Sequence, residues 1–407
     1  MKNTVGILKH LYFISVLLCV ISGCAETSNV SQKPLAQTFV ETGSYDKSKK
    51  YLKNGITVVY LTGTPYEIGF AHGKLCRKEI LEANKQVFDL YEVLLNHPES
   101  QWLKKSRWLE NFIPKEYLNE MRGISDGADI EYDKILFLNT AKTISMANKC
   151  FAFSFRENNS RIITVRQIDN DTKSLIYDNM ILYIIKPQKG YGFAAILTPG
   201  FVDGETGMNE NGITVSQNNI GIRQTEWNIM PVDQLSRYML QYSRSIEDVE
   251  QILDLQNAYP SRLIFVSSKE SASIFELSNK EKARIDMQSS FLSLANHACL
   301  IPSKIVRRSS TRRLEYANRF LVENSEEMDI DKAIELVRSS KITWRWIPGV
   351  ENKQSFIFSP TDLDFWIAIP PDSIFTPASY GPYIGFNLGQ ELYGTGHEPS
   401  PNSFPAF

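Results

Sequence analysis

Histidine is scarce in this chain, and charge of neither sign predominates. The 407 residues include five histidines, 44 lysines and arginines, and 46 aspartates and glutamates, which gives a net charge of -2 and a pI near 6.3. The histidines show no H-E-x-x-H or similar spacing, which counts against a zinc enzyme. The near-neutral balance leaves no basic field of the kind that binds nucleic acid. With 43% apolar residues the chain can bury a substantial core, so we expect a globular protein.

A long hydrophobic run is also missing, although a short one stands near the N-terminus. LYFISVLLCVI follows Lys2 and Lys9 and is shorter than the roughly 20 apolar residues that span a bilayer. The order of charge, apolar run and small residues is that of a secretory signal. The run ends in ISGC, which resembles the lipobox of bacterial lipoproteins. We expect a signal peptide at residues 1–23 and a lipid on Cys24, with Ala25 favouring the outer membrane. An ordinary cleaved signal peptide is the alternative.

Cysteine is scarce as well, and its number limits disulfide bonding. Cys19 falls in the expected signal peptide, which leaves Cys76, Cys150 and Cys299 beside the lipidated residue. Three thiols allow one disulfide at most, and whether Cys76 pairs with Cys299 stays open. At least one thiol therefore remains free in an oxidising compartment, where we expect it to be deeply buried or reactive.

The first part of the chain is predicted to be mostly helical. Residues 24–50 are rich in Ser, Thr and Lys without a clear period, which is typical of a tether. Order is expected from Tyr51, with a strand at 55–63 and a long amphipathic helix that continues to residue 96. Further helices are predicted at 99–112, 114–124 and 131–145, so residues 51–149 form a mostly helical region.

From Cys150 onward the pattern changes to strands. Runs such as FAFSF, RIITVRQI, GITVSQNNI, RLIFVSS and DFWIAIP alternate in period two between turn residues. Helical stretches at 232–255 and 310–340 interrupt them. This order predicts an α+β fold for residues 150–407, in which two antiparallel sheets pack face to face with helices outside, an αββα sandwich. The Pro-rich tail from Gly396 is expected to lack regular structure.

The segment GISDG, Gly123–Gly127, fits the G-x-S-x-G pattern of a serine hydrolase with Ser125 as nucleophile. That motif needs a strand before it and a helix after it. The preceding PKEYLNEMR is helical, so we interpret the two glycines as helix-ending and turn residues. A catalytic Ser125 is therefore the weaker hypothesis.

Cys150 stands at the start of a predicted hairpin, CFAFSFRENNSRIITVRQIDND. If a chain began at this residue, its α-amino group, with a pKa of about 7.7–8.0, would be a base beside its own thiol. The second strand of the hairpin brings Arg166 and Asp169 back to the end at which Cys150 lies. Asp169 could hold the ammonium, and Arg166 could stabilise a thiolate and developing negative charge. On this stretch alone, a buried cysteine with a surface Arg–Asp pair is the simpler interpretation.

The spacing of these residues resembles the active site of the N-terminal-nucleophile cysteine hydrolases, which include bile salt hydrolase and penicillin V acylase. Arg166 follows Cys150 by 16 residues and Asp169 by 19. Downstream, GMNENGITVSQNN resembles the block of those enzymes whose last Asn helps to form the oxyanion hole. The resemblance assigns this role to Asn219, or to Asn218 if the register differs by one.

Further segments resemble one branch, the acyl-coenzyme A:6-aminopenicillanic acid acyltransferase family. LANHACLIP carries a second oxyanion residue over to Asn296, and SSTRRLEYA carries a late active-site arginine over to Arg313, or to Arg312. GTPYEIGFAHG and EYLNEMRGISDGADIEYDKILFLN resemble the pro-region of that family. The resemblance implies that the precursor cuts itself between Lys149 and Cys150 by an N→S acyl shift. It also implies two cleaved chains that stay associated, and no metal or organic cofactor.

We therefore predict a lipid-anchored amidase or acyltransferase of the bacterial cell envelope that forms a thioester on Cys150. The alternatives are an inactive binding protein of the same fold and an ester hydrolase resembling phospholipase B. The expected substrate is a small acyl amide or acyl donor with an apolar group, a class that includes N-acyl amino acids, bile-acid conjugates and β-lactam side chains. Candidates for lining an acyl pocket, with core packing as the simpler alternative, are Trp344, Trp346, Phe365 and Trp366.

Overall fold

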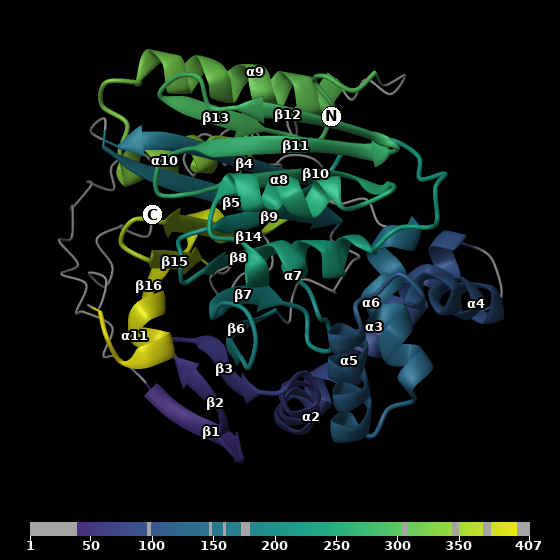
Figure 1. Cartoon of the computed structure of the whole chain (residues 1–407). Helices are drawn as coiled ribbons and strands as arrows, with labels where there is room; N and C mark the ends of the chain where they lie inside the picture. Colours follow the sequence, from purple (N-terminus) through teal and green to yellow (C-terminus); the bar gives the residue numbers. More distant parts are fainter. Residues whose placement is uncertain are drawn as a thin grey trace, which may run out of the picture. The chain divides into compact units, whose positions relative to one another are not determined.

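The structure is a computed structural model, and it describes residues 39–95, 99–145, 149–157, 160–171, 180–302, 308–343, 350–368 and 376–396 (Figure 1). Over these residues the chain forms two β-sheets, preceded by a mostly helical region. The expected signal peptide, Cys24 and the tail from His397 lie outside the described residues. No helix within the described ranges is both long enough and apolar enough to cross a membrane.

The smaller sheet contains Cys150 and has six strands, all antiparallel to their neighbours. In its central hairpin, β4 places Phe151, Phe153 and Phe155 on one face and the smaller Cys150, Ala152 and Ser154 on the other, and both faces are buried. In spatial order the strands are β13 (Phe291–Leu294), β4 (Lys149–Glu157), β5 (Arg161–Asp171), β14 (Val350–Ser359), β15 (Asp364–Ala368) and β16 (Tyr383–Asn387).

The larger sheet has ten strands and joins the N-terminal region to the rest of the fold. Its strands are antiparallel except for β3 and β6, which pair in parallel over six residues, a departure from the all-antiparallel prediction. In spatial order they are β1 (Phe39–Tyr45), β2 (Ser48–Lys53), β3 (Ile56–Gly63), β6 (Ile181–Pro187), β7 (Phe193–Leu197), β8 (Thr206–Asn209), β9 (Thr214–Asn219), β10 (Tyr259–Ser267), β11 (Ala272–Asn279) and β12 (Glu281–Asp286).

The regular structure begins earlier than the sequence predicts. Residues 39–50, expected to belong to the tether, form β1 and the start of β2 at the edge of the larger sheet. Most residues of β1 are exposed, so this edge strand lacks the apolar alternation that marks a buried strand. Strands β8 and β16 are also not predicted, because each is short and contains a glycine and an asparagine, which are depleted in strands.

The helices match most of the predicted segments but are more divided. The long helix expected up to residue 96 breaks at Cys76, which caps the first of two helices. The segments 232–255 and 310–340 each contain two helices as well. The bounds are α2 (Pro65–Leu75), α3 (Arg77–Leu95), α4 (Glu99–Glu110), α5 (Lys115–Ala128), α6 (Tyr132–Ser145), α7 (Val232–Tyr242), α8 (Ile246–Asp254), α9 (Arg308–Glu323), α10 (Ile330–Arg338) and α11 (Leu388–Tyr393).

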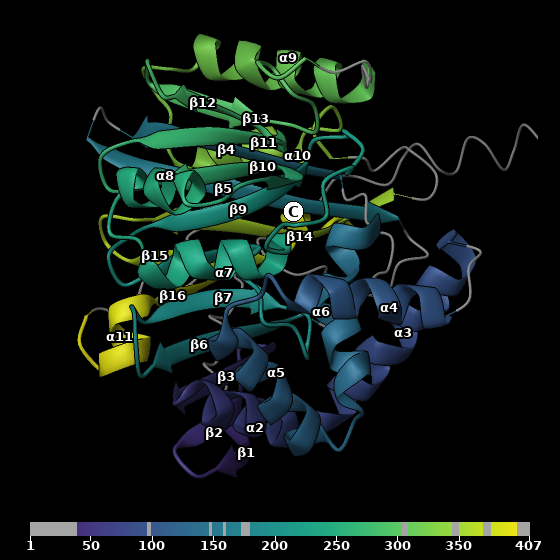
Figure 2. The ribbon, with the colours of Figure 1, turned by 45° about the vertical axis from the view of Figure 1, so that its right-hand side comes forward.

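Helices α2 and α5 lie side by side and correct the interpretation of GISDG (Figures 1 and 2). Gly123 and Gly127 lie inside α5 and do not end it. A Cβ atom on Gly123 would clash with the backbone of α2, and one on Gly73 of α2 would lie 2.6 Å from the carbonyl oxygen of Ile124. The glycines therefore allow two helix backbones to pack closely, a role that the turn interpretation missed. Ser125 has helix on both sides instead of a strand–turn–helix elbow.

Helices cover the outer faces of the two sheets. Phe151 and Phe153 of β4 pack against α9 and α10 in one buried cluster, whereas Ala152 between them packs against Leu263 of β10 in another. The opposite face of β10, which includes Ile264, joins the cluster that contains the apolar residues of α7 and α8. Figure 2 shows α7 and α8 over this face of the larger sheet. The alternating side chains of β4 and β10 therefore bury both faces of both sheets.

Candidate active site

Cys150 is the second residue of β4 and is completely buried. Its backbone N–H, which belongs to the Lys149–Cys150 peptide bond, donates a hydrogen bond to Asn296 Oδ1 at 2.8 Å. Its backbone carbonyl accepts a hydrogen bond from Arg313 Nη1 at 3.2 Å. Two candidate residues that are more than 140 positions away in the sequence therefore contact Cys150 directly.

The β4–β5 hairpin determines which residues share a face with the thiol. Ala152, two residues after Cys150, pairs with Arg166, so Arg166 projects to the same face as the Cys150 side chain. Asp169 pairs with Lys149 at the end of the hairpin and lies on the opposite face. The arginine is thus directed to the thiol side, and the carboxylate is near the nitrogen end of Cys150.

Asp169 has no exposed surface and has partners from two distant segments. Arg313 of α9 forms an ion pair with its carboxylate, and Asn352 of β14 donates a hydrogen bond to its Oδ1 at 2.9 Å. Burial raises the pKa of the Asp169 carboxyl, and the charge of Arg313 opposes that shift. Asn352 is not a predicted site residue. It lies in the polar stretch VENKQ, where no local pattern marks it, and the pairing of β14 with β5 reveals its role.

Arg166 is also fully buried and connects the hairpin to the larger sheet. Its guanidinium donates hydrogen bonds to the side chain of Asn218 and to the backbone carbonyl of Gln217. Arg166 Nη2 also lies 3.8 Å from Glu205 Oε1, so the arginine has a carboxylate partner that the sequence does not predict. The Arg166 guanidinium therefore has fixed partners on β9 and on the loop before β8.

The two asparagines at the end of β9 have different surroundings. Asn218 accepts from Arg166 and donates to the carbonyl of Ala295 at 3.1 Å. Asn219 Oδ1 accepts a hydrogen bond from the backbone N–H of Gly221 at 2.7 Å. Because neighbouring residues of a strand point to opposite faces, the alternative residue, Asn218, is the one that faces Arg166.

A loop after β13 holds Asn296 beside the hairpin. The backbone N–H of Asn296 donates to Ser310 Oγ at 2.7 Å, and His297 Nδ1 lies 2.8 Å from the same hydroxyl. Asn296 Nδ2 donates to the backbone carbonyl of Asn219 at 3.2 Å. Ser310 lies on α9 three residues before Arg313, so one helix positions both predicted residues. Asn296 and Arg313 are thereby brought to Cys150 together.

The electrostatic surroundings of Cys150 keep its thiol neutral in the uncut chain. Burial raises the pKa of the Cys150 thiol to about 11, although the charge of Arg166 opposes this shift and that of Glu205 adds to it. A neutral thiol is a weak nucleophile, so attack on a separate substrate is favoured by a base that takes the thiol proton. The arrangement can support acyl transfer to sulfur once such a base is present, because the Asn296 amide and the Arg313 guanidinium already form hydrogen bonds with the backbone of Cys150.

The other candidate residues do not join this constellation. Arg312 is exposed, whereas Arg313 is buried. Ser125 Oγ donates to the carbonyl of Ile130 at 2.6 Å, within the helical region. Phe365 and Trp366 belong to two different buried clusters because they project from opposite faces of β15, which agrees with their alternative interpretation as core residues.

The remaining predictions concern cysteines, the other pocket residues and metals. Cys76 is buried and Cys299 is exposed, and both are free thiols. Trp344 and Trp346 lie outside the described residues. Within the part of the chain that the structure describes, no cluster of three or more His, Cys, Asp or Glu residues is arranged to hold a metal ion.

A family model described as "Acyl-coenzyme A:6-aminopenicillanic acid acyl-transferase" matches residues 155–342. This segment begins just after Cys150 and contains Arg166, Asp169, Asn296 and Arg313. The match therefore covers most of the candidate site but not the proposed nucleophile.

Two curated proteins and one solved structure illustrate the similarity. The chain is 25% identical over 228 residues to the 40 kDa form of acyl-coenzyme A:6-aminopenicillanic-acid-acyltransferase from Emericella nidulans, covering 53% of this chain and 62% of the relative. It is 24% identical over 226 residues to beta-alanyl-dopamine/carcinine hydrolase from Drosophila melanogaster, covering 49% and 58%. The matched segments thus span less than two thirds of either relative. A variant of the conjugated bile acid hydrolase from Clostridium perfringens aligns with a TM-score of 0.46 and 8% identity, covering 63% of this chain and 97% of that one.

Proposed function

Because the chain belongs to the acyl-coenzyme A:6-aminopenicillanic acid acyl-transferase family, we propose that it is an amidase or acyltransferase that uses Cys150 as its nucleophile. One observation carries the proposal: Asn296 and Arg313, which come from separate segments, both form hydrogen bonds with the backbone of Cys150. Asn296 and Arg313 are themselves buried, where a polar side chain is costly unless it is hydrogen-bonded, and each forms such a bond with this one residue.

The first step is cleavage of the Lys149–Cys150 bond by the chain itself. Cys150 Sγ attacks the carbonyl carbon of Lys149, the C–N bond breaks as the C–S bond forms, and the thiol proton moves to the freed nitrogen. Water then hydrolyses the thioester and leaves a new carboxylate on Lys149 and a free thiol on Cys150. The hydrogen bond from the Cys150 N–H to Asn296 supports this step, because it orients the peptide group whose nitrogen must leave.

Cleavage would supply the base that the buried thiol lacks. The new α-amino group, with an unperturbed pKa of about 7.7–8.0, can take the thiol proton as sulfur attacks the acyl carbon of a substrate. It then returns that proton to the leaving amine. Asp169 supports this role, because it pairs with Lys149 in the hairpin register and so lies near the nitrogen that cleavage would free.

The acyl group leaves the thioester in the second half of the cycle. Transfer to water makes the protein an amidase, and transfer to an amine makes it an acyltransferase. Asn296, together with Asn219 or Asn218, is the proposed source of hydrogen bonds to the oxyanion, and one such donor typically contributes about 10²–10³ in rate. Arg166 stabilises negative charge on the thiol side of the hairpin. The substrate is proposed to be a small acyl amide or acyl donor with an apolar group.

The proposed architecture follows from the same residues. Residues 24–149 form the N-terminal chain after cleavage, with residues 51–149 as its mostly helical region, and residues 150–407 form a catalytic αββα region of four layers. The packing of α7 and α8 on one sheet and of α9 and α10 on the other supports this arrangement. We also propose a signal peptide at residues 1–23 and attachment to the cell envelope through a lipid on Cys24, which rests on the N-terminal sequence alone.

Intact-mass and N-terminal analysis of the purified protein tests the proposal directly. We expect a C-terminal chain that begins at Cys150 in the wild-type protein and a single uncut chain in the Cys150→Ala variant. An uncut wild-type chain, with a Cys150 thiol that iodoacetamide does not label faster than Cys299, would contradict the proposal. That result would favour an inactive binding protein instead.

A further inference from the structure

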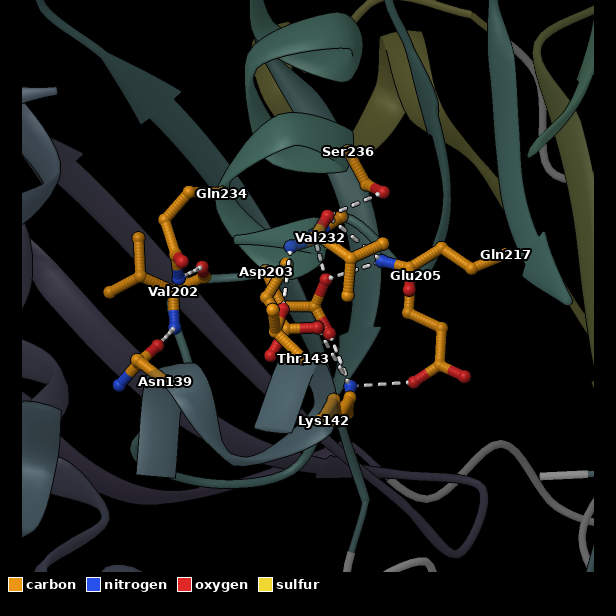
Figure 3. Close-up of polar contacts among 12 residues, drawn as sticks. Asn139, Lys142, Thr143, Val202, Asp203, Glu205, Gln217, Val232, Gln234 and Ser236 are labelled. Atoms are coloured by element: carbon orange, nitrogen blue, oxygen red, sulfur yellow. Dashed lines mark hydrogen bonds and ion pairs between the residues drawn. The ribbon is translucent and has the colours of Figure 1, made fainter. Parts of the chain in front are cut away.

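A buried cluster of charges surrounds Lys142 of α6, and its member Glu205 lies next to Arg166. Figure 3 shows Lys142 with Asp203 and Glu205. Lys142 Nζ lies 2.5 Å from Asp203 Oδ2, 2.7 Å from Glu205 Oε2 and 3.5 Å from Asp233 Oδ1. All four side chains are 5% exposed or less. One lysine therefore faces three carboxyl groups in a region from which water is excluded, where unpaired charge is costly.

Glu205 is the member of this cluster that reaches the candidate active site. Its Oε2 contacts Lys142, and its Oε1 lies 3.8 Å from Arg166 Nη2. The carboxylate therefore bridges two cations that come from different elements, α6 and β5. Arg166 has only neutral partners besides Glu205 among the hydrogen bonds and ion pairs described for it, the Asn218 side chain and the Gln217 carbonyl.

The three carboxyl groups of the cluster differ in the direction of their pKa shifts. Burial raises the pKa of Asp203, and burial together with repulsion from Asp203 raises the pKa of Asp233 well above its usual range. Burial alone would raise the pKa of Glu205 too, but Lys142 and Arg166 hold it below its usual value. Glu205 is therefore held ionised between the two cations.

The end of α6 is held firmly against this cluster. Asn139 Oδ1 accepts from the Val202 backbone N–H at 2.6 Å, and Thr143 Oγ1 accepts from the Val232 backbone N–H at 3.0 Å. Figure 3 shows Asn139 directed at Val202 and Thr143 directed at Val232, both of which belong to the later part of the chain. Lys142 thus has a defined position, because the helix residues three before it and one after it are anchored.

Lys142 lies on the N-terminal side of the proposed cleavage site, whereas Glu205 and Arg166 lie on the C-terminal side. We propose that Glu205 is a positioning residue that holds Arg166 beside Cys150, and that Lys142 supplies from the other cleaved chain the charge that holds Glu205. This inference rests on the proposed function, because the bridge connects two chains only if the Lys149–Cys150 bond is cut. Its consequence is that the N-terminal chain remains part of the active-site support after cleavage.

A double-mutant cycle on Glu205→Gln and Arg166→Gln tests whether Glu205 acts through Arg166. The readout is the rate of self-cleavage, measured by intact mass after purification from a rapid expression pulse. We expect each single variant to cleave at least about tenfold more slowly than wild type, and the double variant to cleave no more slowly than Arg166→Gln alone. Independent effects that multiply in the double variant would overturn the proposal, because Glu205 would then act without Arg166.

Conservative substitution separates positioning from loss of structure. Lys142→Arg keeps the cation and should cleave within about threefold of wild type, whereas Lys142→Met should lose about tenfold or more. The matched control is Glu120→Gln, which removes a carboxylate from another buried ion pair, with Arg237 at 3.1 Å, in the helical region. Glu120→Gln should leave the cleavage rate unchanged. Equal losses in Lys142→Arg and Lys142→Met, or an equal loss in the control, would overturn the positioning role.

The proposal and the proposed function fail in different ways. Normal cleavage in Glu205→Gln would overturn the bridge and leave the function intact. An uncut wild-type chain would overturn self-cleavage, and the same cycle is then read from the rate at which iodoacetamide labels Cys150. In that case the positioning role of Glu205 requires two results. Glu205→Gln alone must change the labelling rate of Cys150, and adding Glu205→Gln to Arg166→Gln must not change that rate further.

Discussion

Arg313 contacts two of the groups that define the candidate site. It donates to the carbonyl of Cys150 and forms an ion pair with Asp169, which is 144 positions away in the sequence. Its neighbour Arg312 points to solvent from the same helix. The SSTRR segment therefore contains two adjacent arginines with opposite surroundings, and helix α9 determines which of them is buried.

This difference predicts unequal effects on stability. Arg313→Met should lower the free energy of unfolding by about 3–5 kcal/mol, because it leaves the buried Asp169 carboxylate without its ion-pair partner. Arg312→Met is the matched control and should change it by less than about 0.5 kcal/mol, as an exposed residue. Urea unfolding followed by circular dichroism in the Cys150→Ala background measures both without cleavage. Equal effects of the two substitutions would contradict the buried pair.

At the scale of elements, the contact between α2 and α5 depends on the absence of side chains. Each helix contributes a glycine pair four residues apart, Gly69 with Gly73 and Gly123 with Gly127. The spacing puts both glycines of a pair on one helix face, so the two backbones can approach closely. This contact, and no catalytic serine, explains the GISDG segment.

Adding one methyl group at this contact should be destabilising. Gly69→Ala would place a Cβ atom against the carbonyl of Glu120, so the helices must separate, and we expect a loss of about 3 kcal/mol in the free energy of unfolding. Ser125→Ala, a truncation on the same helix, should cost about 1 kcal/mol for its hydrogen bond and should leave cleavage unchanged. Thermal unfolding compares the two. A smaller loss in Gly69→Ala than in Ser125→Ala would show that the helices can separate without penalty.

Helix α2 also carries a buried histidine that links stability to pH. His72 Nε2 accepts a hydrogen bond from the backbone N–H of Gly200 at 3.0 Å, which requires this nitrogen to be unprotonated. Burial lowers the pKa of His72 to about 3, and repulsion from Arg237 adds to the shift. The unfolded chain, with a histidine pKa near 6.5, binds a proton at a higher pH than the folded chain does.

The sign of the effect follows from this difference. His72 stabilises the folded state above pH 6.5 and loses that contribution as the pH falls toward 3, by at most about 1.4 kcal/mol per pH unit. His72→Gln keeps an acceptor for Gly200 but does not titrate, so its free energy of unfolding should depend less steeply on pH between 6.5 and 4. Urea unfolding at a series of pH values measures both slopes. Parallel slopes would mean that His72 does not titrate on unfolding.

At the scale of the whole molecule, the two sides of the proposed cleavage site share one sheet. Strand β3 of the N-terminal side pairs in parallel with β6 over six residues, and its neighbours β1 and β2 extend the same sheet. Val58, Val59 and Leu61 of β3 also belong to the largest buried cluster. The N-terminal region is therefore an integral part of the fold, with no separate core among the described residues.

This arrangement predicts that cleavage does not separate the two chains. Both should elute together from size-exclusion chromatography in buffer and should separate only in denaturant, because dissociation would expose β6 and the buried face of β3. Denaturing gel electrophoresis of the eluted peak identifies both chains. Elution of a free N-terminal chain in buffer would contradict the shared sheet.

The sequence by itself determines the local elements and the order of the polar motifs. Short apolar or alternating runs between turn residues predict the β4–β5 hairpin and most other strands, because this pattern is a local property of the sequence. The same hairpin brings Arg166 and Asp169 back toward Cys150. The resemblance to known motifs adds Asn296 and Arg313, and the structure places both in contact with Cys150.

Only the tertiary structure decides which residues meet across sheets and helices. Glu205, Asn352 and Lys142 have no local pattern that marks them, because their partners lie on other elements and their burial depends on the packing of both sheets. The tertiary structure also decides which of Asn218 and Asn219 faces Arg166, because a shift of one residue along a strand turns a side chain to the opposite face of the sheet. The glycines of α5 depend on the presence of α2. Long-range contacts of this type are set by packing, which a local sequence pattern does not encode.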